Sequence, residues 1–217
     1  MEWQLPIQKV ELSHINIGSP WARDKYNNTK PMAPLSYFGP QFRLPFITLL
    51  FPPLPIVEYV PHTGRLVLDM SGSALACIKL NTLQETIVNA VMYHQHTWFK
   101  TEFTKEEVRS GFQPIIERNL LILHCPSTVR SIPVYKDGQW LKDYQPNEIL
   151  QPGMRIRVAT KIHGISFLTK PDTQRAQDQK VQDQRVQDPV QEWTGRYRLQ
   201  HRIQGILFLA GSSEAKA

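Results

Sequence analysis

The sequence predicts a mainly β fold of the α+β class, with one principal helix and an extended N-terminal region. The 17 prolines in 217 residues divide the chain into short segments, which disfavours a helical bundle. Most of these segments carry short apolar runs bounded by turn residues, and only one long stretch has helical spacing. Since 41% of the residues are hydrophobic and 20% are charged, as in ordinary globular proteins, we expect residues 1–217 to form one domain.

The N-terminal part is expected to contain short strands and a long loop. Residues 7–17 alternate loosely between apolar and polar types and predict a strand. Residues 18–40 are rich in Gly, Pro, Asn and Ser and predict a surface loop. The apolar runs 42–51 and 56–60 are bounded by prolines, so they predict strands at sheet edges.

The middle of the chain is expected to hold the helices and two hairpins. Residues 65–80 predict a hairpin that turns at a Ser-Gly-Ser sequence. A capping box at Thr82–Glu85 predicts the start of the principal helix, which extends to about Lys100, and a second box at Thr104–Glu107 predicts a short helix. A buried strand is predicted over 120–124 and a hairpin over 132–141.

Residues 169–191 have a different composition from the rest of the chain. They repeat Val-Gln-Asp, contain no aromatic residue and hold few large apolar residues. Such a segment buries too little apolar surface to offset its ordering entropy, so it predicts a flexible insertion, with a polar helix as the alternative.

The cysteines and the hydropathy pattern predict an intracellular protein. Cys77 and Cys125 lie in separate apolar runs and match neither a metal-binding spacing nor a disulfide framework, so we expect buried free thiols. Free thiols suit the reducing cytoplasm or nucleus. No apolar run reaches the ~20 residues that span a bilayer, and the first residues do not resemble a signal peptide, so no membrane association is expected.

Positive charge is concentrated in the C-terminal part of the chain. Residues 1–150 contain 14 Lys and Arg against 13 Asp and Glu, whereas residues 151–217 contain 11 against 6. This asymmetry favours an anionic partner for the C-terminal part, with nucleic acid preferred over a membrane surface.

An internal repeat places the positive charges on two strands. Residues 155–168 and 196–209 are identical at seven of fourteen positions. Because strand side chains alternate between faces, each copy predicts one apolar face and one cationic face. The predicted phosphate contacts are Arg155, Arg157, Lys161, Arg196, Arg198 and Arg202. Like charges opposite each other destabilise a sheet, so this pattern indicates an anionic ligand.

Glycines and aromatic residues refine this interpretation. Gly164 and Gly205 occupy the same place in the two copies and predict β-bulges. Beyond a bulge Phe167 and Phe208 turn into the core, and without a bulge they face the ligand.

Single-stranded nucleic acid is bound by a basic groove with aromatic rings that stack on bases. The rings near the basic strands include Trp140 and Tyr135, and the predicted stacking residues are Trp193 and Tyr197, with core packing as the alternative for each.

Three segments resemble the OB-fold single-stranded-DNA-binding proteins of large DNA viruses and related phages. They are PMAPLSYFG at 31–39, GMRIRV at 153–158 and KIHGISF at 161–167, separated by a small hairpin and an amphipathic helix. The resemblance covers roughly residues 35–217 and implies an OB-like β-barrel that coats exposed strands during replication or recombination. The sequence at 211–217 is not acidic, unlike the tail of many replicative binding proteins, so recruitment of other proteins through such a tail is not expected.

No sequence motif predicts catalysis. We find no phosphate-binding glycine loop, nucleophile elbow or zinc-protease motif, and His94 and His96 are spaced to point to different faces of a helix. The predicted protein is therefore not an enzyme, uses no cofactor, metal or small-molecule substrate, and binds single-stranded DNA or RNA with self-association along the strand. Two alternatives stay open: a virion assembly protein with an acidic partner, and a nucleic-acid enzyme whose metal site gathers Asp69, Glu85 and Asp143.

Overall fold

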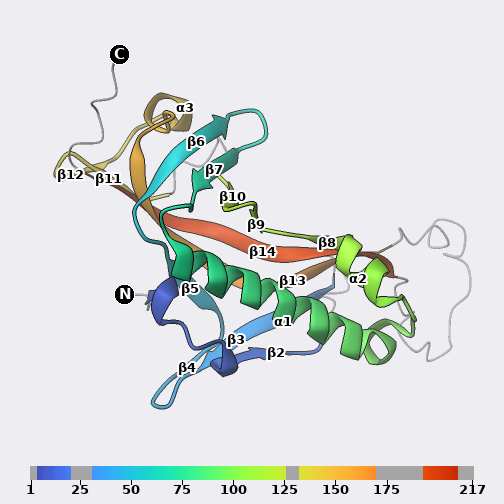
Figure 1. Cartoon of the computed structure of the whole chain (residues 1–217). Helices are drawn as coiled ribbons and strands as arrows, with labels where there is room; N and C mark the ends of the chain where they lie inside the picture. The colour runs from blue at the N-terminus through green and yellow to red at the C-terminus, as the bar shows by residue number, and fades with distance from the viewer. Residues whose placement is uncertain (1–3, 21–30, 126–131, 170–192, 210–217) are drawn as a thin grey trace, which may run out of the picture.

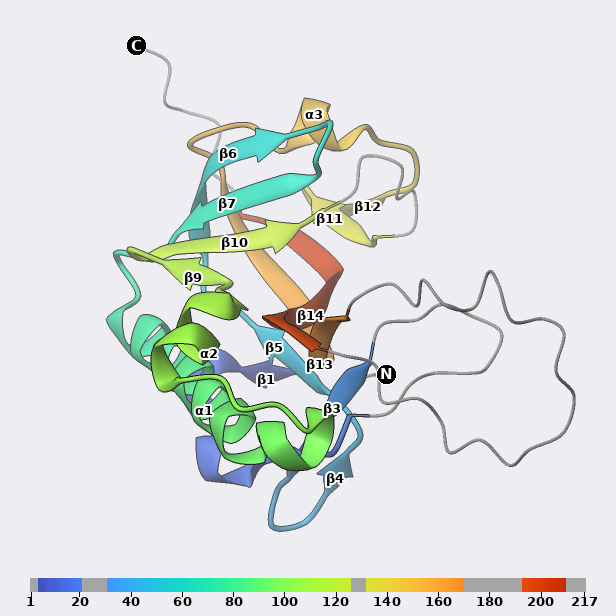
Figure 2. The same ribbon diagram turned by 90° about the vertical axis from the view of Figure 1, so that its right-hand side faces the viewer.

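The computed structural model describes residues 4–20, 31–125, 132–169 and 193–209, and within them the protein is mainly β with few helices (Figures 1 and 2). Fourteen strands are connected by pairing. The strands are β1 (Leu5–Pro6), β2 (Ile15–Ile17), β3 (Met32–Phe38), β4 (Arg43–Leu44), β5 (Ile47–Leu50), β6 (Leu54–Val60), β7 (Arg65–Asp69), β8 (Phe112–Gln113), β9 (Ile116–Glu117), β10 (Leu120–His124), β11 (Val134–Lys136), β12 (Gln139–Leu141), β13 (Arg155–Thr169) and β14 (Trp193–Phe208). The helices are α1 (Ala74–Phe99), α2 (Lys105–Gly111) and α3 (Pro146–Ile149), with 3₁₀ turns at η1 (Ile7–Lys9) and η2 (Leu12–His14).

Two long strands, β13 and β14, lie at the centre of the sheet. The main path of paired strands is β12-β11-β14-β13-β6-β7-β10-β9. Strand β13 also pairs with β3 and β5, and β14 also pairs with β8 in parallel. Figure 1 shows both strands running diagonally through the molecule, with the β11–β12 hairpin near one end and α2 near the other. Each of the two strands is therefore held in place by several neighbouring strands along its length.

Helix α1 forms because residues 74–99 contain no Gly or Pro and place apolar side chains on one stripe. It follows Ser73 and ends at Phe99, and the next residue, Lys100, adopts the left-handed conformation that commonly terminates helices. Its C-terminal residue Phe99 contacts Phe167 of β13 and Trp193 of β14, with ring centroids 4.8 Å and 5.1 Å away. The helix thus packs on the apolar face of the two central strands.

Several predicted elements are confirmed. The buried strand over 120–124 is β10, and the hairpin over 132–141 contains β11 and β12. The capping box of α2 is present, because the hydroxyl of Thr104 accepts from the Glu107 amide and the Glu107 carboxylate accepts from the Thr104 amide. Both cysteines are free and buried.

The predicted hairpin over 65–80 is wrong, because only its first half is a strand. After β7 the chain turns at Ser71 and Gly72 and enters α1 directly at Ala74. The predicted helix start at Thr82 is also wrong, since the Thr82 hydroxyl donates to the carbonyl of Ile78 one turn earlier in the same helix. A Ser-Gly-Ser turn precedes a helix as readily as it joins two strands.

The N-terminal predictions need three corrections. Residues 7–17 form two 3₁₀ turns before the short strand β2, and the predicted loop 18–40 contains the strand β3. Strands β5 and β6 are not edge strands, because each lies between two partners. Of the predicted insertion 169–191, Thr169 belongs to β13, and residues 170–191 lie outside the described residues.

Candidate nucleic-acid interface

Strands β13 and β14 pair in an antiparallel ladder that brings the two repeat copies side by side. Paired residues share a face of the sheet, and Lys161 is directly opposite Arg202. On the same face Arg198 is opposite Ser166, and Arg157 is opposite Leu207. The alternation of each strand adds Arg155 and Arg196 to this face. The prediction that the six cations share one face is therefore consistent with the observed register; we call this surface the cationic face.

Two bulges lie beyond the cations of their strands and turn the side chains that follow into the core. The register shifts between Ile162 and Gly164 on β13, and between Gly205 and Ile203 on β14, as the two glycines predicted. Each shift inserts one extra residue, so beyond it the odd and even positions of the strand exchange faces. Phe167 and Phe208 consequently lie in the core, which confirms their predicted place.

The six cations differ in exposure. Arg155, Arg196, Arg198 and Arg202 are exposed, whereas Arg157 and Lys161 are half-buried. The Lys161 ammonium lies 3.3 Å from the centre of the Phe46 ring, and one Arg155 nitrogen donates to the Pro53 carbonyl at 3.4 Å. In the described parts of the chain, Arg157, Arg196, Arg198 and Arg202 form no ion pair with a carboxylate, whereas Arg65 and Arg109 each pair with a glutamate at 2.7 Å. The exposed arginines of β14 are therefore not neutralised by the described residues.

The two predicted stacking residues are in the core, which corrects that prediction. Trp193 is 1% exposed, and its indole nitrogen donates to the Arg196 carbonyl at 2.9 Å. Tyr197 is 3% exposed and stacks on Phe167, with ring centroids 5.9 Å apart. Burial also raises the pKa of the Tyr197 phenol. Neither ring can stack on a base without unpacking the core.

A different aromatic pair shares the face of the cations. Strand β11 pairs with β14 in parallel, which places Tyr135 beside Leu207, and the β11–β12 hairpin places Trp140 beside Tyr135. One row across four strands therefore reads Arg157, Leu207, Tyr135, Trp140 on a single face. Trp140 is 64% exposed and contacts Tyr135 edge to face at 5.1 Å. Alternation within the hairpin indicates that the two rings share a face, but only the pairing with β14 places them beside the cations.

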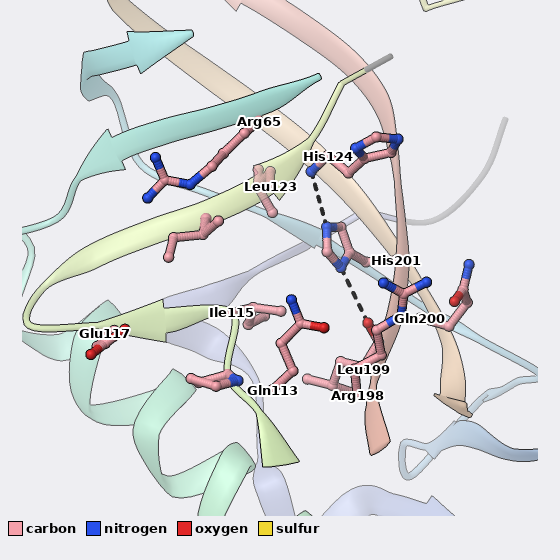
Figure 3. Close-up of a pocket in the computed structure, with 12 residues that line it drawn as sticks. Arg65, Gln113, Ile115, Glu117, Leu123, His124, Arg198, Leu199, Gln200 and His201 are labelled. Carbon is pink, nitrogen blue, oxygen red and sulfur yellow. Dashed lines mark hydrogen bonds between the residues drawn. The ribbon is translucent and has the colours of Figure 1, made fainter. Parts of the chain in front are cut away.

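Two hollows border the cationic face near Arg198. The larger, of about 510 Å³, lies between β10 and β14, with residues 113–117 at its lower side (Figure 3). The smaller, of about 240 Å³, is lined by Arg196, Ser166 and Leu168 among others. Arg198 and Gln113 line both.

His201 bridges the two strands that border the larger hollow. Its Nε2 accepts from the backbone amide of His124 on β10 at 3.2 Å, and its Nδ1 lies 3.3 Å from the Leu199 carbonyl (Figure 3). A neutral ring with its proton on Nδ1 satisfies both contacts. Burial lowers the pKa of His201, the contact with the Leu199 carbonyl opposes this shift, and the nearby His124 and Arg198 add to it, so the neutral ring is favoured.

The structure does not gather metal ligands in the parts of the chain that it describes. No group of three or more His, Cys, Asp or Glu side chains there could hold a metal ion. Asp69 accepts hydrogen bonds from Ser71, and Glu85 pairs with Arg109. The alternative in which Asp69, Glu85 and Asp143 converge on a metal is therefore not supported.

The fold and the site define the class of the protein as a mainly β, α+β fold with a cationic sheet face. No family model matches the sequence, and no curated protein or solved structure matches it significantly. No helix in the described ranges is long and apolar enough to cross a membrane.

Proposed function

We propose that the protein binds single-stranded DNA through the cationic face, with little sequence specificity. The observation that carries the proposal is the shared face of the cations of β13 and β14, whose exposed arginines on β14 have no carboxylate partner among the described residues. Like charges close together on one face destabilise a sheet, and a polyanion lying across the exposed arginines of β14 offsets their repulsion.

The geometry of the face suits an extended strand. Alternate residues on one face of a strand are about 7 Å apart, so Arg196 and Arg198 are about 7 Å apart along β14, and Arg202 lies about 14 Å beyond Arg198. The exposed Trp140 adds a ring on the same face, next to Tyr135. A basic track combined with an exposed ring is typical of proteins that bind single strands, since bases of a single strand are free to stack.

We further infer that the central strands form an OB-like barrel. Supporting this inference, the path β14-β13-β6-β7-β10 returns towards its start, because β8 pairs with β14 and the segment 115–117 contacts β10. The bridge from His201 to the His124 amide also joins β10 to β14. In such a barrel the cationic face would be an outer surface, accessible to a strand of any length, as expected for a protein that coats DNA during replication or recombination.

A second candidate function is virion assembly through an acidic protein partner. It is favoured by the solvent-exposed side of α1, where Leu75, Ile78 and Tyr93 are 50%, 61% and 82% exposed. Exposed apolar side chains on a helix suit protein contacts, including contacts between copies of this chain along a DNA strand. The two candidates differ in which polyanion the cationic face prefers.

A direct binding comparison tests the proposal. Fluorescence anisotropy would measure the affinity of the protein for mixed-sequence single-stranded DNA, the matching duplex, RNA of the same sequence and polyglutamate. We expect single-stranded DNA to bind more tightly than the duplex and polyglutamate, with an affinity that falls as salt is added. Preference for polyglutamate would favour assembly, and equal affinity for duplex and single strand would contradict the proposal.

A further inference from the structure

The hollow between β10 and β14 arises because one edge of β14 is only partly paired. On this edge β14 pairs with β8 at Tyr197 and Arg198 and with β11 at Ile206 and Leu207. Between these two pairings the described strands leave the edge of β14 open, and β10 lies across the gap (Figure 3). His201 bridges the gap at one point, and the larger hollow, of about 510 Å³, lies beside it. We call this hollow the cavity. That volume lies in the range of small-ligand sites.

The lining of this cavity combines apolar walls with a few polar groups. Ile115, Ile122 and Leu199 contribute aliphatic surface. The Gln113 side chain extends into the space below the His201 ring in Figure 3. Within the described chain, no hydrogen bond is formed by the Gln113 amide, which offers one acceptor and two donors. Aliphatic walls suit the faces of a flat ring, and a primary amide suits its polar edge.

The cavity borders the cationic face at Arg198. Arg198 lines both the cavity and the smaller hollow, which also includes Arg196. Figure 3 shows the Gln200 side chain on the side of β14 that faces away from the His201 ring. By register, this is the face that Gln200 shares with Arg198 and Arg202. A strand whose phosphates contact Arg196 and Arg198 would therefore pass the mouth of the cavity.

We propose that this cavity is a nucleobase subsite that accepts one unstacked base from a strand bound on the cationic face; the inference rests on the proposed function. The Gln113 amide pairs with the polar edge of the base, the aliphatic residues contact its faces, and Arg198 contacts the adjacent phosphate. A glutamine amide can donate and accept at once, as in its pairing with adenine, and it can rotate to suit other bases. Turning one base out of a single strand costs little compared with extracting it from a duplex.

The test separates contacts to bases from contacts to phosphates. The Kd of a 15-mer of thymidine and the Kd of an abasic oligomer with the same number of phosphates are measured for the wild type, for Gln113→Leu and for the control Gln41→Leu. Gln41 is an exposed glutamine between β3 and β4, outside both hollows. We expect Gln113→Leu to weaken binding of the thymidine 15-mer about tenfold, through two lost hydrogen bonds, and to leave the abasic oligomer unchanged.

Each outcome decides a different point. An unchanged affinity of Gln113→Leu for the thymidine 15-mer, or an equal loss for both oligomers, would overturn the subsite while leaving the proposed function intact. Failure of the wild type to bind either oligomer would instead refute the proposed function. Titration with thymidine monophosphate alone identifies the source of the base: saturable binding that Gln113→Leu abolishes assigns the cavity to free nucleotides as well. If thymidine monophosphate does not bind and Gln113→Leu weakens only the binding of the 15-mer, the cavity accepts only bases of a bound strand. Thermal unfolding of each variant confirms that it is folded.

Discussion

Replacing the three exposed arginines of β14 tests the cationic face most directly. In the triple variant Arg196→Gln, Arg198→Gln and Arg202→Gln, the side chains keep their polarity and lose their charge. None of the three arginines pairs with a carboxylate of the described chain, so the substitutions leave no described carboxylate without its partner. The triple variant is therefore expected to fold as the wild type does and to bind every DNA sequence more weakly.

The magnitude follows from the number of exposed cations. Each phosphate neutralised on a single strand contributes about −0.7 to the slope of log K against log salt concentration. Arg155 and the three arginines of β14 are exposed, which predicts a wild-type slope of about −2.8 and a triple-variant slope of about −0.7. Between about 50 and about 200 mM salt, the wild-type affinity is then expected to fall roughly 50-fold and that of the triple variant roughly threefold.

A matched control separates local contacts from total charge. Lys9, Lys105 and Arg118 are also exposed and lie in η1, in α2 and in the turn between β9 and β10. Their triple replacement by glutamine removes the same net charge, and we expect it to leave the slope near the wild-type value. Anisotropy titrations at four or more salt concentrations measure the slopes. Equal slopes for the wild type and the β14 variant would refute the assignment of the phosphate contacts to this face.

Three further predictions follow from individual residues. Trp140→Ala should cost about 1–3 kcal/mol of single-strand binding through lost stacking, whereas Tyr93→Ala, which removes an exposed ring on α1, should change binding little; the same anisotropy assay compares them. Gly164→Ala should lower the free energy of unfolding in urea by about 1–3 kcal/mol, because a Cβ there would overlap the β3 backbone, and Gly72→Ala, where a Cβ meets nothing within 4 Å, should not. The free energy of unfolding should fall as the pH drops below about 6.5, since burial lowers the pKa of His201 in the folded chain and the unfolded chain takes up the proton first. Urea unfolding of His201→Gln should show a smaller fall in stability over the same pH range. An identical fall in the variant and the wild type would contradict this role of His201.

The cationic face could be predicted from sequence because the pattern that encodes it is local. Side chains alternate along a strand whatever its neighbours are, so Arg196, Arg198 and Arg202 share a face once residues 196–209 form a strand. The glycines at 164 and 205 likewise indicated the bulges. The two copies are joined by a long-range strand pairing. The repeat suggested this pairing, because two strands with the same pattern of apolar and cationic faces fit side by side in one sheet.

The aromatic residues were assigned wrongly because their neighbours in sequence are polar. Trp193 lies among Glu, Thr and Arg residues, which suggested exposure. Its parity, however, matches that of Tyr197 and Leu199, which are buried, so the alternation already indicated the core. Trp140 could not be chosen instead of Trp193 from the sequence. Its place beside the cations depends on the parallel pairing of Tyr135 with Leu207, and these two residues are far apart in the sequence.

The helix start was missed for a similar reason. The segment 74–80 contains a short apolar run that suits a strand, and the preceding glycine suits a hairpin turn. The buried positions at Ala76, Cys77, Leu80, Leu83 and Gln84 follow helical spacing. Reading this period across residues 74–84, instead of stopping at Leu80, indicates one continuous helix.

The pairing of Thr169 with Trp193 has a practical consequence for engineering the chain. The two central strands meet at these residues, and each strand is also anchored by other partners, so their association does not depend on a particular connection between them. Residues 170–192 can accordingly be replaced by a short Asn-Gly turn between Thr169 and Trp193. Such redesigned chains would carry the arginine-bearing ladder on a more compact scaffold suited to crystallisation with an oligonucleotide.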